Sequence, residues 1–160
     1  MSLDQDTKRR LKVQVWVYWI PLGSGVSLSQ EVKILLLKTK PERGSLWQPV
    51  TGGVEAGEEI ESAARRETWE ETGLSFRLPI FELSKPFEFE SRFGPAVEYP
   101  YAIEVNEPSD HPPQIRLDSR EHDQYVWLSP KETQERIQFL AQVDVLQCLI
   151  DRINQKNKEN

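Results

Sequence analysis

Alternating apolar and polar positions predict strands in the first third of the chain. Residues 11–20, LKVQVWVYWI, alternate in this way and are rich in β-branched and aromatic side chains, which is typical of a strand. Residues 31–38, EVKILLLK, predict a second strand that is buried on both faces in its middle. Residues 47–50 form a short extended piece that leads into a pair of glycines. Prolines and glycines, which favour turns, separate these segments.

Two later segments have the composition and spacing of helices. Residues 59–72 contain good helix formers and neither proline nor glycine, and Gly73 follows where a helix C-cap glycine belongs. Ser129 and Pro130 suit the N-cap and the first position of a second helix. Cys148 lies in that helix, where we expect it to pack as a small core residue. The apolar residues near helical spacing there are Ile137, Leu140, Ala141, Val145, Leu149 and Ile150.

Between these helices the pattern returns to strands and loops. Residues 74–89 contain strand material that two prolines interrupt. Residues 97–105, VEYPYAIEV, predict a strand in which Pro100 indicates a sheet edge or a bulge. A polar, proline-rich loop follows, and residues 125–128 predict a short strand. The order of elements is therefore that of a mixed α/β protein.

The composition fits one globular domain. The chain has 160 residues, of which 38% are apolar and 29% charged, and it contains no internal repeat or linker. We therefore expect a single domain over residues 1–160, with flexible ends at residues 1–7 and 154–160. No apolar run approaches the roughly 20 residues of a membrane helix. One cysteine allows no internal disulfide, so we expect a cytoplasmic protein that does not bind membranes.

The charge balance narrows the class of ligand. A net charge of −6 argues against a general nucleic-acid binder, including a DNA-binding protein, because such proteins usually present a basic face. A small polyphosphate ligand stays compatible with this charge, since a bound metal ion can reverse the local sign of an acidic site.

Three glutamates on the first predicted helix are candidates for metal chemistry. Glu67, Glu70 and Glu71 stand at positions i, i+3 and i+4, which fall on one helical face. Carboxylates this close repel one another unless a cation neutralises them, and Mg²⁺ prefers oxygen ligands. Taken alone, the three glutamates favour the simpler interpretation of a solvated acidic face. The sequence around them changes that balance.

The residues before the helix supply what a metal-phosphate site needs. Gly52 and Gly53 allow the backbone to turn sharply and to approach a ligand closely. Their carbonyls can bind a cation, and their amides can meet phosphate oxygens. Arg66 can pair with Glu58 and hold this loop against the helix. Together these features favour a metal site over a solvated face.

Residues 52–74, GGVEAGEEIESAARRETWEETGL, resemble the Nudix box. That pattern is a glycine, five residues, Glu, seven residues, Arg-Glu, two residues, Glu-Glu, one residue, Gly and an aliphatic residue. Thr68 departs from it, because the family prefers an aliphatic residue there, and we expect this change to affect packing and not chemistry. The matching residues are Gly52, Glu58, Arg66, Glu67, Glu70, Glu71, Gly73 and Leu74.

The resemblance implies a role for each acidic residue. Glu70 and Glu71 would bind Mg²⁺, for which Mn²⁺ can substitute, and Glu67 would be a further ligand or the base that activates water. A carbonyl near Thr51 would complete part of the metal's coordination shell. The family usually adds one acidic residue from a late loop, and Glu121 is the best candidate here.

The same resemblance implies the fold and the loop contact. It predicts an α/β/α sandwich with a mixed β-sheet, and a salt bridge between Arg66 and Glu58 that joins the loop to the helix. Either a monomer or a homodimer is compatible with it. The implied reaction is hydrolysis of a phosphoanhydride bond in a small nucleotide-like substrate.

The residues beside the box favour one substrate group. Residues 46–55, LWQPVTGGVE, resemble the dATP/dihydroneopterin triphosphate pyrophosphohydrolases, as do Glu121-His122 and Trp127-Leu128 before a proline-started helix. This implies a nucleoside or pterin triphosphate, cleaved to pyrophosphate and monophosphate. Residues 90–92 lack the tyrosine typical of dinucleoside polyphosphate enzymes, and the proline typical of ADP-ribose enzymes is also missing.

Several other functions stay open at this point. One is another Nudix substrate, such as a 5′-RNA pyrophosphate, a nucleotide sugar or a dinucleoside polyphosphate. Another is a non-catalytic nucleotide-binding Nudix domain, although such domains usually lack box glutamates that are intact here. Aromatic rings can stack on a base and arginines can bind phosphate, but such residues are more often in the core or in surface salt bridges. The candidate substrate contacts are Trp47, Gly52, Gly53, Arg92, Phe93 and Arg116.

Overall fold

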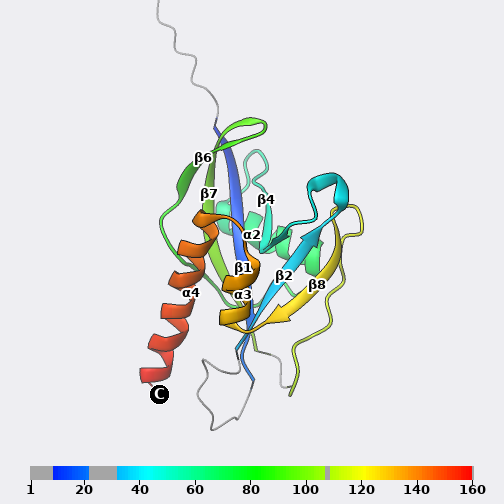
Figure 1. Cartoon of the computed structure of the whole chain (residues 1–160). Helices are drawn as coiled ribbons and strands as arrows, with labels where there is room; N and C mark the ends of the chain where they lie inside the picture. The colour runs from blue at the N-terminus through cyan, green and yellow to red at the C-terminus, as the bar shows by residue number, and fades with distance from the viewer. Residues whose placement is uncertain (1–8, 22–31, 107–108, 160) are drawn as a thin grey trace, which may run out of the picture.

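The structure, a computed structural model, describes residues 9–21, 32–106 and 109–159. In these residues eight strands form one mixed sheet that helices cover on both faces (Figure 1). The strands are β1 (Arg10–Trp19), β2 (Lys33–Thr39), β3 (Trp47–Gln48), β4 (Val50–Gly53), β5 (Ile80–Glu82), β6 (Phe87–Ser91), β7 (Gly94–Val105) and β8 (His122–Leu128). The helices are α2 (Ile60–Thr72), α3 (Pro130–Arg136) and α4 (Leu140–Glu159), with a 3₁₀ turn η1 (Pro41–Arg43).

Strand β1 organises the sheet. It pairs in parallel with β7 along its whole length, from Arg10 opposite Ala96 to Trp19 opposite Val105. Its other edge is shared, because β4 pairs with its first half and β2 with its last residues. Strand β2 pairs in turn with β3 and β8. The β1–β4 pairing places the glycine pair at the end of β4 beside the start of β1.

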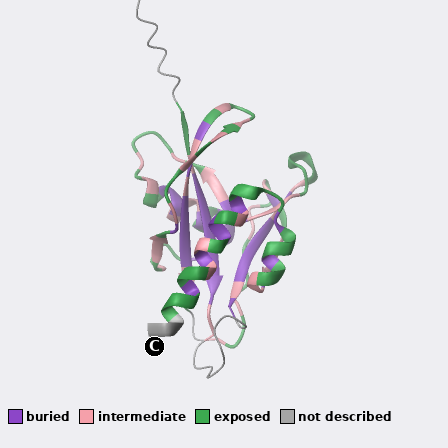
Figure 2. Cartoon of the chain, turned by 60° about the vertical axis from the view of Figure 1, so that its left-hand side comes forward, coloured by how far each residue is buried: buried purple, intermediate pink, exposed green. Residues whose placement is uncertain are grey.

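Alternation along β1 fills a separate core on each face of the sheet. Val13, Val15 and Val17 pack in the core on the α2 side, whereas Trp16 and Tyr18 pack in the core on the α3–α4 side. Figure 2 shows the strands as the buried centre, with mostly exposed residues along the outer faces of the helices. Each fully buried large side chain contributes roughly 2 kcal/mol. The predicted α/β/α sandwich with a mixed sheet is confirmed.

Helix α2 ends as its sequence predicts. Gly73 caps it with φ of 75°, a left-handed conformation that glycine adopts without strain, and its N–H donates to the Trp69 carbonyl at 2.8 Å. Thr68, the departure from the family pattern, is buried. Its hydroxyl donates to the carbonyl of Ala64 at 2.8 Å. This hydrogen bond satisfies the buried hydroxyl, a group that the aliphatic residue typical of the family does not have.

The predicted closing helix is two helices. Ser129 and Glu132 form a capping box that starts α3, but the backbone becomes extended at Ile137 and α4 begins at Leu140. Ile137 reaches the core, whereas Leu140 is 84% exposed and Ala141 is also exposed. The prediction that Leu140 and Ala141 belong to the apolar face of this helix is therefore wrong. Cys148 is half-buried and so does not lie in the core.

Helix α4 continues to Glu159, through polar residues for which the sequence predicts a frayed end. The flexible end predicted at residues 1–7 lies outside the described residues, as does the start of the strand predicted at residues 31–38. None of the helices in the described part of the chain is both long and apolar enough to cross a membrane.

Pro100 lies in an interior strand and not at a sheet edge. Strand β7 pairs with β1 on one side and with β6 and β5 on the other. The pairing with β6 ends at Glu98 and that with β5 begins at Tyr101, so Pro100 falls in the gap between these two neighbours. A residue without an N–H is tolerated there because no ladder bond is required.

Candidate active site

The glycine at the end of β4 makes room for a carboxylate of α2. A Cβ atom placed on Gly52 would lie 2.0 Å from the Cδ atom of Glu67. Atoms that are not bonded cannot approach so closely, so any side chain at this position would clash with Glu67. Gly53, the next residue, has open space around the same position. The pairing of β4 with β1 and the packing of α2 against β4 therefore hold Glu67 directly over the Gly52 backbone.

Arg66 ties the loop, the strand and the helix together. Its Nε donates to Glu58 Oε2 at 2.8 Å, and its Nη2 donates to Glu58 Oε1 at 3.1 Å and to the Gly53 carbonyl at 2.8 Å. Its Nη1 donates to Glu67 at 3.0 Å and to Glu70 at 3.2 Å. The Arg66 guanidinium holds the pKa of Glu58 below its usual value, so this pair stays charged at neutral pH.

Three carboxylates gather at the buried side of α2. Glu71 is 1% exposed, and its Oε2 atom has no hydrogen-bond partner among the described residues. Burial raises the pKa of Glu71 well above its usual value, and a hydrogen bond with Glu121 adds to this shift. Burial also raises the pKa of Glu67 to about 7, although the Arg66 charge opposes the shift. These carboxylates therefore hold protons at a pH where exposed glutamates are ionised.

Glu121 reaches this group from the turn before β8. The Lys40 amide donates to its backbone carbonyl at 3.1 Å, and Arg43 of η1 lies 3.7 Å from its Oε1 atom. The next residue, His122, is 3% exposed, and neither ring nitrogen has a partner among the residues described. Burial lowers the pKa of His122, which keeps its ring neutral. Donor atoms of Glu71, Glu121 and His122 lie within 4.8 Å of one another.

This donor set fits a divalent cation. Carboxylate oxygens are the ligands that Mg²⁺ prefers, and a cation would replace the protons that burial forces onto Glu67 and Glu71. The unpartnered Glu71 Oε2 atom is the kind of buried polar atom that a metal ion would satisfy. His122 adds an imidazole, a donor that suits zinc or iron better than it suits Mg²⁺ or Mn²⁺. Sequence reasoning missed it, although it directly follows Glu121.

Glu70 lies at the margin of this group, and Thr51 contacts the group through its backbone. The Glu70 side chain is 43% exposed and turns toward Arg66, so it is not among the gathered donor atoms. The backbone of Thr51 hydrogen-bonds the carboxylate of Glu71, which places β4 against the cluster. Of the five residues predicted to hold the metal, the fold thus brings Glu67, Glu71 and Glu121 together beside the Thr51 backbone, with Glu70 at the margin.

Beyond Gly52 and Gly53 in β4, the four other predicted substrate contacts fall in three separate places. Trp47 packs against the core on the α3–α4 side, with the guanidinium carbon of Arg136 5.1 Å from its ring centroid. Arg116 lies at the C-terminal end of α2, where its guanidinium carbon is 5.9 Å from the Trp69 ring centroid. Arg92 and Phe93 form the turn between β6 and β7.

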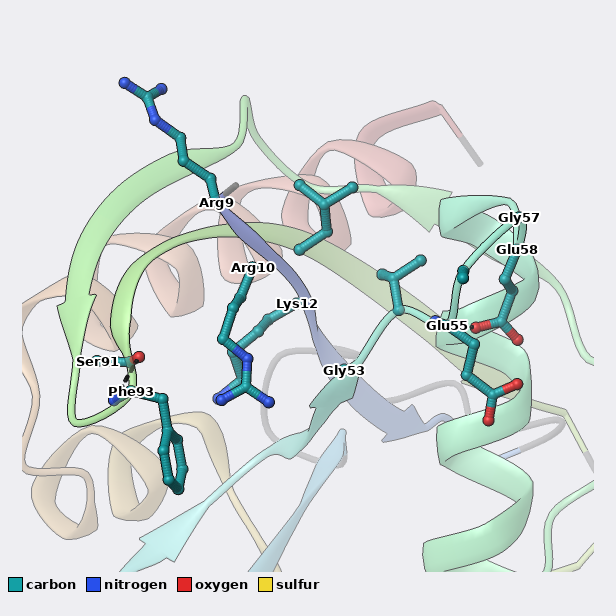
Figure 3. Close-up of a pocket in the computed structure, with 12 residues that line it drawn as sticks. Arg9, Arg10, Lys12, Gly53, Glu55, Gly57, Glu58, Ser91 and Phe93 are labelled. Atoms are coloured by element: carbon teal, nitrogen blue, oxygen red, sulfur yellow. Dashed lines mark hydrogen bonds between the residues drawn. The ribbon is translucent and has the colours of Figure 1, made fainter. Parts of the chain in front are cut away.

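Phe93 lines a pocket with a volume of about 660 Å³ beside the loop that follows β4. The pocket lies between the start of β1, residues 53–58 and the β6–β7 turn. Figure 3 shows Arg10, Lys12 and Phe93 on one side of it, with Glu55 and Glu58 on the other. Sequence reasoning missed the two cations of β1, because nothing in the local pattern connects them with residue 93.

Comparison with known proteins identifies the domain. The model of the NUDIX domain family matches residues 21–146. An octanoyltransferase from Myxococcus xanthus is 39% identical over 112 residues, which are 68% of this chain and 30% of that protein. The asymmetrical bis(5′-nucleosyl)-tetraphosphatase of Mus musculus is 35% identical over 103 residues, 63% of this chain and 67% of that protein.

The fold also matches solved structures. The E. coli dihydroneopterin triphosphate pyrophosphohydrolase superimposes with a TM-score of 0.69 at 20% identity, covering 89% of this chain and 95% of that one. At this identity the likeness establishes the fold alone. The chain spans less than a third of the Myxococcus xanthus relative, so the activity of that whole protein is not transferred to it.

Proposed function

The chain belongs to the Nudix family, and on that premise we propose that it is a Mg²⁺-dependent hydrolase of a nucleoside or pterin triphosphate. The products would be pyrophosphate and the monophosphate. The observation that supports hydrolysis most strongly is the group of carboxylates around the buried Glu71, which has Glu121 beside it and Glu67 on the same helix face. A solvated acidic surface would not bury Glu71, and it would not raise the pKa values of Glu67 and Glu71.

Each carboxylate has a part in the proposed reaction. Glu71 and Glu121 would hold the cation, with Glu70 and the Thr51 carbonyl as further ligands from the margin of the site. Bound Mg²⁺ supplies positive charge that offsets the charge developing on the phosphate oxygens. With the cation bound, Glu67 would be ionised, and its carboxylate can take a proton from water. Arg66 fixes the position of Glu67 through the 3.0 Å hydrogen bond.

The proposed reaction is a displacement at phosphorus by water. The water oxygen forms a new bond to phosphorus, and its proton passes to a Glu67 carboxylate oxygen. The phosphoanhydride bond between the first and second phosphates breaks, and the leaving group, which is pyrophosphate or the monophosphate according to the phosphorus attacked, keeps the bonding electron pair on its oxygen. Without Glu67 in its charged form, the water would lack a base at this position.

A dinucleoside tetraphosphate is the second candidate substrate. The 35% identity with the Mus musculus bis(5′-nucleosyl)-tetraphosphatase favours it. The sequence of residues 90–92, Glu-Ser-Arg, counts against it, since that group typically has a tyrosine in this region. We retain the triphosphate as the first candidate because residues 46–55 support it.

A substrate panel tests the proposal. Release of phosphate and pyrophosphate is measured with Mg²⁺ and with Mn²⁺ for nucleoside triphosphates, dihydroneopterin triphosphate, diadenosine tetraphosphate, ADP-ribose, nucleotide sugars and triphosphorylated RNA. We expect the fastest release of pyrophosphate from a triphosphate, and a loss of roughly 100-fold or more in Glu71→Gln. Faster cleavage of diadenosine tetraphosphate would select the second candidate. Absence of metal-dependent turnover on the whole panel would overturn the hydrolase.

Three further properties belong to this proposal. The free Cys148 is compatible with a reducing, cytoplasmic setting. The net charge of −6 supports a small phosphate substrate over DNA. The protein would act as a monomer or a homodimer, which light scattering of the purified chain can decide.

A further inference from the structure

The turn between β6 and β7 exposes a large aromatic ring. Phe93 is 66% exposed, although the burial of a phenylalanine is what normally stabilises a fold. The turn that carries it is well defined, because the Ser91 hydroxyl accepts from the Phe93 amide at 3.2 Å and donates to the Gly94 carbonyl at 2.7 Å. Gly94 has φ of 107°, which glycine permits. The fold therefore holds the turn in place and leaves the ring exposed.

Cations surround this ring. The guanidinium carbons of Arg10 and Arg92 lie 4.8 Å and 4.9 Å from the Phe93 ring centroid. Lys12 lines the same pocket, with its Nζ atom 5.7 Å from the Phe89 ring centroid. Within the described part of the chain none of these three cations forms an ion pair, whereas the neighbouring Arg9 pairs with Glu88.

Such a cluster is unusual in an acidic chain. With a net charge of −6, carboxylates are plentiful, yet Arg10 and Lys12 line one wall of the pocket, with Arg92 against the Phe93 ring, and none of the three has a carboxylate within salt-bridge distance in the described residues. Like charges this close repel one another, and a bound anion would relieve the repulsion. The arginine guanidinium is suited to phosphate, which it can bind through two parallel hydrogen bonds.

The pocket adjoins the carboxylate group through one loop. Gly53 lines the pocket, and its neighbour Gly52 lies against Glu67. The opposite wall holds Glu58, which Arg66 neutralises through two hydrogen bonds, and the exposed Glu55 (Figure 3). The space beside Gly53 is open, because no atom lies within 4 Å of a Cβ placed there. A ligand can therefore extend along the loop from one site to the other.

We propose that this pocket binds the end of the substrate that does not react. An aromatic ring of the substrate would stack on Phe93, and the phosphate next to that ring would be bound by Arg10 and Lys12, with Arg92 beside them. This inference rests on the proposed function, since it assigns a second subsite to the same substrate. It explains why an exposed ring and unpaired cations occur together beside the catalytic loop.

Steady-state kinetics on the substrate that the panel selects test this subsite. The variants are Phe93→Ala and the double variant Arg10→Gln/Lys12→Gln, and the control is Arg77→Gln, which removes one positive charge from a loop beyond the C-terminal end of α2. We expect KM to rise about tenfold in each test variant, which is the effect of one stacked ring or one charge-assisted hydrogen bond, while kcat changes less than twofold. The control should keep the KM of the wild type.

Inhibition by inorganic tripolyphosphate separates the ring contact from the phosphate contact. This probe has no ring, so Phe93→Ala should leave its inhibition constant unchanged, whereas Arg10→Gln/Lys12→Gln should weaken it severalfold. Wild-type KM values in both test variants would overturn the subsite, provided that the wild type turns over substrate. An equal rise of KM in Arg77→Gln would also overturn it, because the effect would then be one of net charge. If the wild type turns over nothing, the proposed function fails first.

Discussion

The carboxylate group and the cationic pocket lie on two sides of one loop. They differ in charge, in burial and in the elements that supply their residues. Glu71 is buried and the Glu67 side chain is only 13% exposed, and both residues lie on one helix face and have raised pKa values. Arg10, Lys12 and Phe93 come from two strand ends more than 80 residues apart, and Phe93 is largely exposed. Helix α2 alone places Glu67 and Glu71 on one face, although Glu121 joins them from the turn before β8, whereas only the complete sheet brings the cations to the ring. The helical part of the chemical site thus follows from local sequence, and the recognition pocket depends on tertiary structure.

The difference in burial predicts different consequences of mutation. A buried carboxylate has few alternatives to its present position, so a change there should act on kcat. Exposed cations are solvated and adjustable, so a change there should act on KM and by a smaller factor. Four predictions test this contrast, beginning with the largest effect.

Gly52→Ala should reduce kcat by about 100-fold. The new Cβ would occupy the place of the Glu67 carboxyl group, and displacing a reacting group by about 1 Å has an effect of this size. Gly53→Ala is the matched variant, because the same atom meets nothing within 4 Å there, and its loss should be far smaller. Similar losses of kcat in the two variants would mean that Glu67 is not held against Gly52.

Arg66→Lys should reduce kcat about tenfold. Lysine keeps the charge but cannot bind Glu58, Gly53 and Glu67 at once as the guanidinium does. We expect the thermal midpoint to fall by a few degrees as well, because the loop loses its link to α2. Retention of full kcat by Arg66→Lys would show that charge alone positions Glu67.

Glu67 should make the metal-free protein less stable as pH rises. Its folded pKa of about 7 lies above its unfolded value near 4.5, so the folded state binds the extra proton. The resulting stability is present below pH 4.5 and is lost as pH rises through 7. Between pH 6 and 8 this amounts to about 1 kcal/mol.

Urea unfolding in EDTA at pH 6 and pH 8 measures that change. The wild type is compared with Glu67→Gln, because His122, whose lowered pKa acts in the opposite direction, is present in both proteins. From pH 6 to pH 8 the wild type should lose about 1 kcal/mol of unfolding free energy relative to Glu67→Gln. A constant difference would mean that Glu67 is ionised throughout this range.

The smallest expected effect is the response of the cationic pocket to salt. Raising the ionic strength from 50 to 200 mM screens exposed charges and should raise the wild-type KM about threefold. Arg10→Gln/Lys12→Gln should show less than half of that change, and kcat should not respond in either protein. A salt response of equal size in both proteins would place the relevant cations elsewhere.

The sequence indicated the carboxylates because their chemistry depends on spacing within one helix. Glu67 and Glu71 could be named, but their unequal burial relative to Glu70 depends on the sheet against which α2 packs. Arg10 could not be placed beside Phe93, because this contact requires the parallel register of β1 and β7. The sequence also did not predict the break between α3 and α4, because this break too depends on tertiary packing. Leu140 continues the apolar period yet is exposed, because the extended backbone at Ile137 ends α3 and the buried face of α4 begins later in the chain.

The most direct test of the carboxylate group is metal binding with proton release. Isothermal titration of Mg²⁺ or Mn²⁺ into the apo-protein at pH 7, in two buffers of different ionisation enthalpy, counts the protons released per ion. We predict a release of roughly one proton by the wild type, because the raised pKa values of Glu67 and Glu71 leave protons for the metal to displace. Glu71→Gln should bind the ion more weakly and release fewer protons. Binding without proton release, or binding that Glu71→Gln leaves unchanged, would contradict the assignment of this group as the metal centre.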